Sequence, residues 1–318
     1  MAKYVNINGN NIPIRSSDPS NPQLGEIWYN TTSNSLKGQK NIPTASWASG
    51  GVLGTARYFA QSGAGTQTAG LVFGGQSPVK YNTESYNGTA WTEVNDMSRA
   101  PADTTGMGAG GTQTSALAAG TQPVSTLSES WDGSCWTSTP ALNSGRGYLA
   151  GSIQSSTAGI VYGGLGPPAG VALTELYNGS TWSEVADLNT ARRSNVGVGS
   201  STAALGMGGY VAGNVANCES WNGSSWTAVN NQSNAGGGSA FGTLASAVKT
   251  SGSGNVVELW DGTNWSSGVN VPTTLSNRSG IGTSSLGLLA GGEPPPTGVT
   301  TTDEYVGAGP ATVTITSS

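Results

Sequence analysis

Short apolar runs alternate with turns of Gly, Asn, Asp, Ser and Thr along most of the chain. Residues 71–73, 160–162 and 288–290 are such runs, and short apolar runs bounded by turn residues are typical of β-strands. No window places apolar residues at helical spacing behind a capping residue. The pattern therefore predicts an all-β chain.

One sequence frame recurs: Glu, any residue, Tyr or Trp, Asn or Asp, Gly, two further residues, then Trp. Five segments carry it, at residues 83–94, 128–139, 174–185, 218–229 and 257–268. Each Asn-Gly or Asp-Gly pair predicts a tight hairpin turn, because both residues tolerate positive φ. With Glu304 counted for a sixth, incomplete copy, successive acids lie 39 to 46 residues apart: Glu84, Glu129, Glu175, Glu219, Glu258 and Glu304. A repeat of this length is typical of a β-propeller.

Two further features precede the frame. A strand of small and apolar residues ends in paired glycines, as at Gly74-Gly75 and Gly163-Gly164, which suits strands that crowd towards a central axis. An arginine stands ten to thirteen residues after a Trp in four repeats, at Arg57, Arg146, Arg192 and Arg278. Arg99 is a shifted copy, and the fifth repeat has none.

The order Arg, strand with paired glycines, Glu-x-aromatic and Trp resembles the kelch repeat over residues 47–305. The resemblance implies four-stranded blades around a channel. Six copies predict a six-bladed kelch-like β-propeller over residues 45–310. The strand at Trp47 is expected to close the sixth blade, with residues 312–316 as the alternative. Residues 311–318 are expected to form a C-terminal tail.

Residues 1–44 lie outside the repeats and are predicted to form a docking arm that ends in a β-hairpin. The stretch from Gly25 to Lys37 contains GEIWYN, a polar turn and LK. It resembles a short hairpin of tail fibres and other virion proteins of bacteriophages, which makes Ile27, Trp28 and Tyr29 candidate docking residues. The alternative is an ordinary exposed hairpin.

The composition excludes several classes of function. Charged residues make up 9% of the chain, the net charge is −5, and no His is present. Scattered basic residues do not favour nucleic acid as a partner, and no apolar stretch is long enough to predict membrane insertion.

The absence of His excludes a copper oxidase like galactose oxidase, and Asp-Gly pairs without an intervening residue do not match sialidase Asp-boxes. The N-terminus shows no secretory pattern, and two cysteines, Cys135 and Cys218, do not make a disulfide framework.

An acid that recurs in every repeat is expected to be architectural, so no catalytic, cofactor-binding or metal-binding residue is predicted, and no cofactor. The chain is predicted to be a non-enzymatic structural and recognition protein of a virion, with other virion proteins and a host-surface glycan or protein as partners. The alternative is a secreted or cellular propeller that binds a glycan or peptide. Divergent loops 77–83, 166–174 and 293–302 are the expected recognition surface, with these candidate residues: Pro78, Lys80, Pro167, Pro168, Glu293, Pro294 and Pro295.

Overall fold

The computed structural model describes residues 12–42, 44–58, 63–76, 81–98, 106–166, 168–252, 254–293 and 298–315. Strands, turns and loops make up these residues, and none of them is helical. The chain divides into two compact units: a small unit of Met1–Ser46 with Gly307–Ser318, and a large unit of Trp47–Val306. The expected all-β class is therefore confirmed.

The large unit contains six four-stranded antiparallel sheets in its described part, here called sheets 1 to 6 in chain order. Sheets 1 to 3 are β5 (Gly63–Thr66), β6 (Ala69–Phe73), β7 (Thr83–Tyr86), β8 (Trp91–Val94); β9 (Gly108–Thr112), β10 (Ser115–Ala119), β11 (Ser128–Trp131), β12 (Trp136–Ser138); and β13 (Ala150–Ser155), β14 (Ala158–Tyr162), β17 (Thr174–Tyr177), β18 (Trp182–Glu184). Sheets 4 to 6 are β19 (Val196–Ser200), β20 (Ala203–Met207), β21 (Cys218–Trp221), β22 (Trp226–Val229); β23 (Gly238–Gly242), β24 (Ala247–Ser251), β25 (Val257–Trp260), β26 (Trp265–Ser267); and β27 (Ser279–Gly282), β28 (Leu286–Ala290), β29 (Thr302–Val306), β4 (Ser46–Ser49). In sheet 3, β15 (Leu165–Gly166) and β16 (Ala169–Gly170) pair within the loop after β14.

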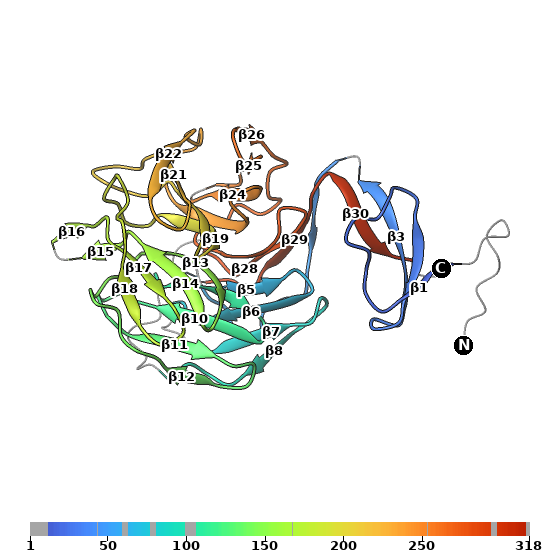
Figure 1. Ribbon diagram of the computed structural model, residues 1–318, viewed down its shortest axis with the longest axis horizontal. Coiled ribbons are helices and arrows are strands. Elements are labelled where there is room, and N and C mark those ends of the chain that lie inside the picture. The colour runs from blue at the N-terminus through green and yellow to red at the C-terminus, as the bar shows by residue number, and fades with distance from the viewer. Residues whose placement is uncertain are drawn as a thin grey trace. The chain divides into compact units, whose positions relative to one another are not determined.

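The six sheets follow one another around a common axis (Figure 1). The first strand of each sheet contacts the first strand of the next, and β27 of sheet 6 contacts β5 of sheet 1. The ring of first strands is therefore closed, and the large unit has a β-propeller-like fold.

Sheet 6 takes its fourth strand from the other end of the unit. β4 lies beside β29, and the Trp47 ring packs on Tyr305 with ring centroids 4.8 Å apart. This is the position that the sequence around Trp47 predicts. A sheet built from both ends of the unit joins the first and last repeats, and so holds the ring closed at the seam.

The repeated frame folds as a hairpin between the third and fourth strands. In sheet 1, Tyr86 pairs directly with Trp91, with ring centroids 4.7 Å apart. Between them Gly88 has a φ of 90°, and Asn87 Oδ1 accepts hydrogen bonds from the backbone of Thr89 and Ala90, both at 2.9 Å. The turn chemistry thus sets the register of the aromatic pair.

The hydrophobic core lies between neighbouring sheets. One buried cluster joins Leu117 of sheet 2 to Val161 and Trp182 of sheet 3. Small residues permit this close packing: a Cβ atom on Gly287 would lie 2.1 Å from the ring of Phe241 in the preceding sheet. Tight sheet-on-sheet contacts of this kind account for part of the high glycine content.

The small unit is a four-stranded sheet in the order β1-β2-β3-β30. It consists of β1 (Ile14–Arg15), β2 (Ile27–Asn30), β3 (Ser35–Ile42) and β30 (Gly309–Thr314), and β1 runs parallel to β2. The structure differs here from the expected separate arm and tail. β30 pairs with β3 over six residues, so both chain ends share one sheet, and the alternative closure of sheet 6 by residues 312–316 does not occur.

Candidate functional site

Buried ion pairs recur through the large unit. Arg57 lies 2.6 Å from Glu84, Arg146 lies 2.8 Å from Glu175, and both pairs are fully buried. Arg192 pairs with Glu219 at 2.5 Å in the same way. Burial lowers the pKa of the Arg57 and Arg146 guanidinium groups, while the partner carboxylates oppose that shift. A buried ion pair also needs hydrogen-bond partners for the donors and acceptors that the pair itself leaves unsatisfied.

Those partners are backbone groups. Arg57 Nη1 donates to the carbonyl oxygens of Gly74 and Asn82, both at 2.9 Å, which lie at the two ends of the loop between β6 and β7. The Glu84 carboxylate accepts from the backbone of Gly54 at 2.6 Å and Thr55 at 3.2 Å, which follow β4 of sheet 6. The Arg57–Glu84 pair therefore holds the loop between β6 and β7 and ties sheet 1 to sheet 6.

The sixth acid of the repeat is Asp303, and the expectation of Glu304 is wrong. Asp303 pairs across the sheet with Leu289, as Glu84 pairs with Val72, and its carboxylate lies 2.6 Å from Arg278. Glu304 stands one position further and accepts a 2.5 Å hydrogen bond from the Tyr86 hydroxyl. The frame missed this because the last copy has Tyr directly after its Glu.

Sheet 5, which lacks the arginine, uses a different arrangement. Glu258 accepts from the backbone of Ser233 at 2.6 Å and Asn234 at 3.1 Å. Lys249 pairs directly opposite Glu258 in the neighbouring strand and is buried. Burial lowers the pKa of Lys249 to about 8, and Glu258 opposes the shift. A lysine therefore supplies the buried positive charge in this sheet.

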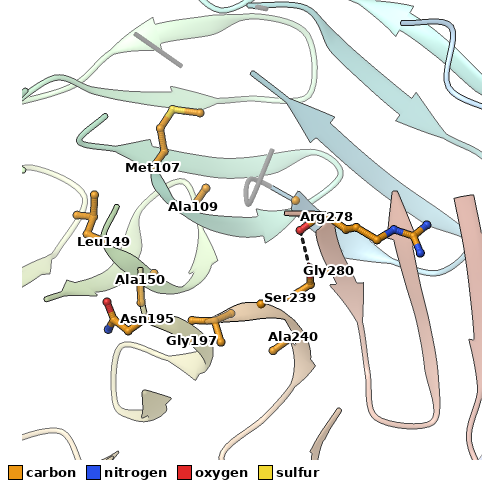
Figure 2. A pocket seen from close by; sticks show the side chains of 14 residues that line it. Met107, Ala109, Leu149, Ala150, Asn195, Gly197, Ser239, Ala240, Arg278 and Gly280 are labelled. Carbon is orange, nitrogen blue, oxygen red and sulfur yellow. Dashed lines mark hydrogen bonds between the residues drawn. The ribbon is translucent and has the colours of Figure 1, made fainter. Parts of the chain in front are cut away.

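The axis of the ring is lined by the first strands. At the end where these strands begin, the lining residues include Asn195, Ser239 and Gly280 around a space of about 50 Å³ (Figure 2). At the other end, glycines dominate the lining around about 200 Å³. The Arg278 side chain points away from this space in Figure 2, towards its partner Asp303. The narrow end has room for a few water molecules, and its lining is mainly backbone and small side chains.

The predicted recognition loops leave the sheets at one common edge, because each joins a second strand to a third. Pro78, Lys80, Pro167, Pro294 and Pro295 lie outside the described residues. Pro168 is exposed. Glu293 accepts a hydrogen bond of 2.5 Å from the Asn277 side chain. Recognition by these residues stays a prediction.

The same loop edge carries apolar residues that the sequence analysis missed. Tyr81, Leu127, Tyr210, Val211 and Val256 are exposed in these connections. The Arg193 guanidinium lies 4.9 Å from the centre of the Tyr210 ring. Large side chains inside Gly- and Asn-rich loops were the signal that could have identified them.

The three candidate docking residues lie on two faces of the small sheet. Trp28 is fully buried and donates from its indole nitrogen to Asp18 Oδ1 at 2.9 Å. Ile27 and Tyr29, on either side of it in β2, are half-buried. Trp28 therefore stabilises the small unit itself, whereas docking through Ile27 and Tyr29 stays a prediction.

The described residues contain no group of three or more His, Cys, Asp or Glu placed to hold a metal ion. Cys135 and Cys218 are both free thiols. In the described part of the chain no helix is long and apolar enough to cross a membrane.

No protein-family model matches this chain, and no curated protein matches it. The solved structure of YjhT is similar, with a TM-score of 0.61 and 11% sequence identity over 79% of this chain and 95% of that chain. At this identity the likeness shows the fold alone.

Proposed function

We propose that this chain is a non-enzymatic structural and recognition component of a bacteriophage virion, built on a six-bladed kelch-type propeller. In this proposal each of sheets 1 to 6 is one blade. The repeat of Arg, paired glycines, acid and Trp supports the kelch type, and the cyclic contacts of the first strands support the blade count.

The observation that carries the proposal is that the repeated charged side chains are buried and hold the sheets together. The carboxylates of Glu84, Glu175 and Asp303 are buried against an arginine, and those of Glu84 and Glu175 also bind backbone N–H groups of the preceding sheet. A glycosidase needs two carboxylates facing a substrate. The carboxylates of Glu84 and Glu175 are instead bonded to arginines and to the backbone of the neighbouring sheet. This supports a rigid scaffold whose function is to present loops.

The virion assignment has two supports. The hairpin from Gly25 to Lys37 resembles those of phage tail fibres. The small unit joins both chain ends in one sheet that shares no strand with the six sheets of the large unit, which suits a docking module. Its partners would be other virion proteins, and a glycan or protein of the host surface would bind the ring.

The second candidate function is a secreted or cellular propeller that binds a glycan or peptide. The exposed aromatic and aliphatic side chains on the loop edge, including Tyr81 and Tyr210, favour it. Exposed aromatics are common at recognition sites. In that case the small unit would be a dispensable appendage.

Mass spectrometry of purified phage particles from cultures that carry the gene tests the assignment. We expect peptides of this chain at a constant ratio to the major capsid protein across a density gradient. The chain free in the medium or on cells, with none co-sedimenting with particles, would favour the second candidate.

A further inference from the structure

A groove of about 610 Å³ lies between sheets 4 and 5, at the edge opposite the loops. Its lining comes from the turns after β19, β23 and β25, and includes Ala203, Leu244, Ala245, Asp261 and Thr263. Pockets for small ligands are typically of this size.

The groove lies at the junction where one repeated side-chain hydrogen bond is missing. In sheets 1, 2, 3, 4 and 6 one residue of the turn between the first and second strands forms a hydrogen bond with the preceding sheet. Gln113 Nε2 donates to the carbonyl oxygens of Gly70 at 3.2 Å and Tyr86 at 2.6 Å, and Gln67 makes the same bonds to Gly287 and Tyr305.

Serine bridges three of the other junctions. Ser156 bonds Ser115 at 2.8 Å, Ser201 bonds Gln154 at 2.8 Å, and Ser284 bonds Ser246 at 2.8 Å. Leu244 is the residue at this position in sheet 5. Its side chain has no hydrogen-bonding group and instead packs against the apolar cluster that sheets 4 and 5 share, so this junction has no side-chain hydrogen bond from the turn. A single break in a repeated joint is expected where function competes with packing.

The chemistry of the groove is mixed. Leu244, Ala203 and Ala245 supply apolar surface, while Ser200, Thr243 and Thr263 supply hydroxyl groups. Asp261 Oδ1 accepts from the backbone of Thr263 at 2.8 Å and Asn264 at 2.7 Å. These N–H bonds lower the pKa of Asp261, so its carboxylate is ionised at neutral pH and can only accept hydrogen bonds. Its Oδ2 has no partner among the residues that the structure describes.

We propose that this groove binds a neutral sugar residue of a glycan. A sugar ring offers hydroxyl donors to Asp261 and an apolar C–H face to Leu244 and Ala203. The groove has no cationic side chain, and the chain carries a net charge of −5, so acidic sugars are disfavoured. The inference rests on the proposed recognition function and assigns it a ligand class and a place.

Saturation-transfer NMR with the full chain and simple sugars tests the proposal. The probes are methyl glucoside, methyl galactoside, methyl mannoside, N-acetylglucosamine and, as the acidic comparison, N-acetylneuraminic acid. We expect at least one neutral sugar to bind and the acidic sugar to bind more weakly. No transfer to any neutral sugar at millimolar concentration would overturn the proposal.

Two variants locate the site. Leu244→Gln installs the residue found at Gln67 and Gln113, which would bridge to sheet 4 and replace an apolar wall of the groove with an amide, so we expect binding to be weakened in a folded protein. Asp261→Asn is expected to weaken binding about tenfold, as for one charge-assisted hydrogen bond. Asp132→Asn is the matched control, because Asp132 occupies the same turn in sheet 2 beside Gln113. Equal binding by the Leu244→Gln and wild-type proteins would overturn the proposal.

A host-cell adsorption assay separates this inference from the function on which it rests. If the wild-type chain and Leu244→Gln adsorb equally, the groove is rejected and the recognition role stands. If neither adsorbs while sugars still bind the wild-type chain, the groove stands and the host-recognition role fails.

Discussion

At the scale of single residues, the ring is held by charges inside it. Arg57, Arg146, Arg192 and Arg278 are all buried against a carboxylate. Such pairs gain little over apolar packing, but removing one partner leaves an uncompensated charge in a low-dielectric interior. We therefore expect that a substitution which removes one of these charges without changing the shape of the side chain lowers the unfolding free energy of the large unit.

Adjacent acids in β29 give a matched test of that expectation. Asp303→Asn removes the charge beside Arg278 and is expected to cost about 3–5 kcal/mol of unfolding free energy, the range for breaking a buried ion pair. Glu304→Gln keeps an acceptor for the Tyr86 hydroxyl and is expected to cost about 1 kcal/mol. Urea denaturation of both variants measures the two costs. Equal costs would contradict the assignment of Asp303 to the repeat.

Lys249 predicts a pH dependence of stability. Burial lowers its pKa from 10.5 to about 8, so between these values the unfolded chain binds more protons than the folded one, and folding becomes more favourable as the pH rises. Burial raises the pKa of Cys218, which acts in the opposite direction, so the comparison needs a variant that keeps Cys218. From pH 8 to pH 10, the unfolding free energy of the wild-type protein should rise relative to that of Lys249→Met. Urea denaturation at both pH values measures this difference. Parallel profiles would show that Lys249 does not titrate in this window.

At the scale of elements, the Trp that begins the fourth strand joins sheets 2 and 4 to the sheet before each of them. Trp136 donates from its indole nitrogen to Thr83 at 2.9 Å, and Trp226 donates to Thr174 at 3.1 Å. In both cases the threonine begins the third strand of the preceding sheet. The hairpin that presents the Trp is thus both a local turn and a joint between sheets.

The hairpin turns should accept Asp in place of Asn. Asn178 Oδ1 accepts from the backbone of Ser180 and Thr181, both at 2.9 Å, and Asp132 makes the equivalent bonds in sheet 2. Asn178→Asp should leave the melting temperature unchanged at pH 7, whereas Asn178→Leu should lower it because the two N–H groups lose their acceptor. Calorimetry checks both, and a large fall for the Asp variant would contradict the equivalence of the turns.

The seam of the ring depends on Trp47. Its ring packs on Tyr305 and Phe241, and its indole donates to the Val269 carbonyl oxygen at 2.8 Å. Trp47→Ala should cost about 2–4 kcal/mol of unfolding free energy, at the low end for aromatic truncation because Trp47 is only half-buried. Trp28→Ala is the comparison, since it should loosen the small unit alone. A ring as stable as wild type after Trp47→Ala would argue against closure by β4.

At the scale of the whole molecule, the two ends of the chain depend on each other. β3 pairs with β2 on one side and with β30 on the other. The larger unit closes without these strands, because β4 supplies the last strand of sheet 6. Loss of one chain end should therefore affect the small unit and spare the ring.

Deletion of residues 309–318 tests this division. Without β30, the small sheet keeps three strands and exposes the edge of β3, so residues 12–42 should lose protection in hydrogen exchange. Protection in β6, β14 and β28 should not change. Loss of protection throughout the ring would show that the two units fold as one.

Local chemistry determined much of this protein. The Asn-Gly and Asp-Gly turns, the aromatic pairs across them and the repeat period were all predicted from neighbouring residues, because a hairpin is specified by residues that are close in the chain. The closing strand was predicted as well, since Trp47 repeats the pattern of a fourth strand. These features fold in nearly the same way in the five complete copies, whose turn glycines have φ between 90° and 96°.

Only the tertiary structure decided how distant residues meet. Asp303 rather than Glu304 binds Arg278, Lys249 supplies the charge of the missing arginine, β30 joins β3 rather than sheet 6, and Leu244 leaves one junction without the hydrogen bond of the turn. These outcomes depend on how strands and sheets pack against one another, which no single local pattern specifies. The sequence by itself determined the repeat, and the packing between the copies decided where they differ.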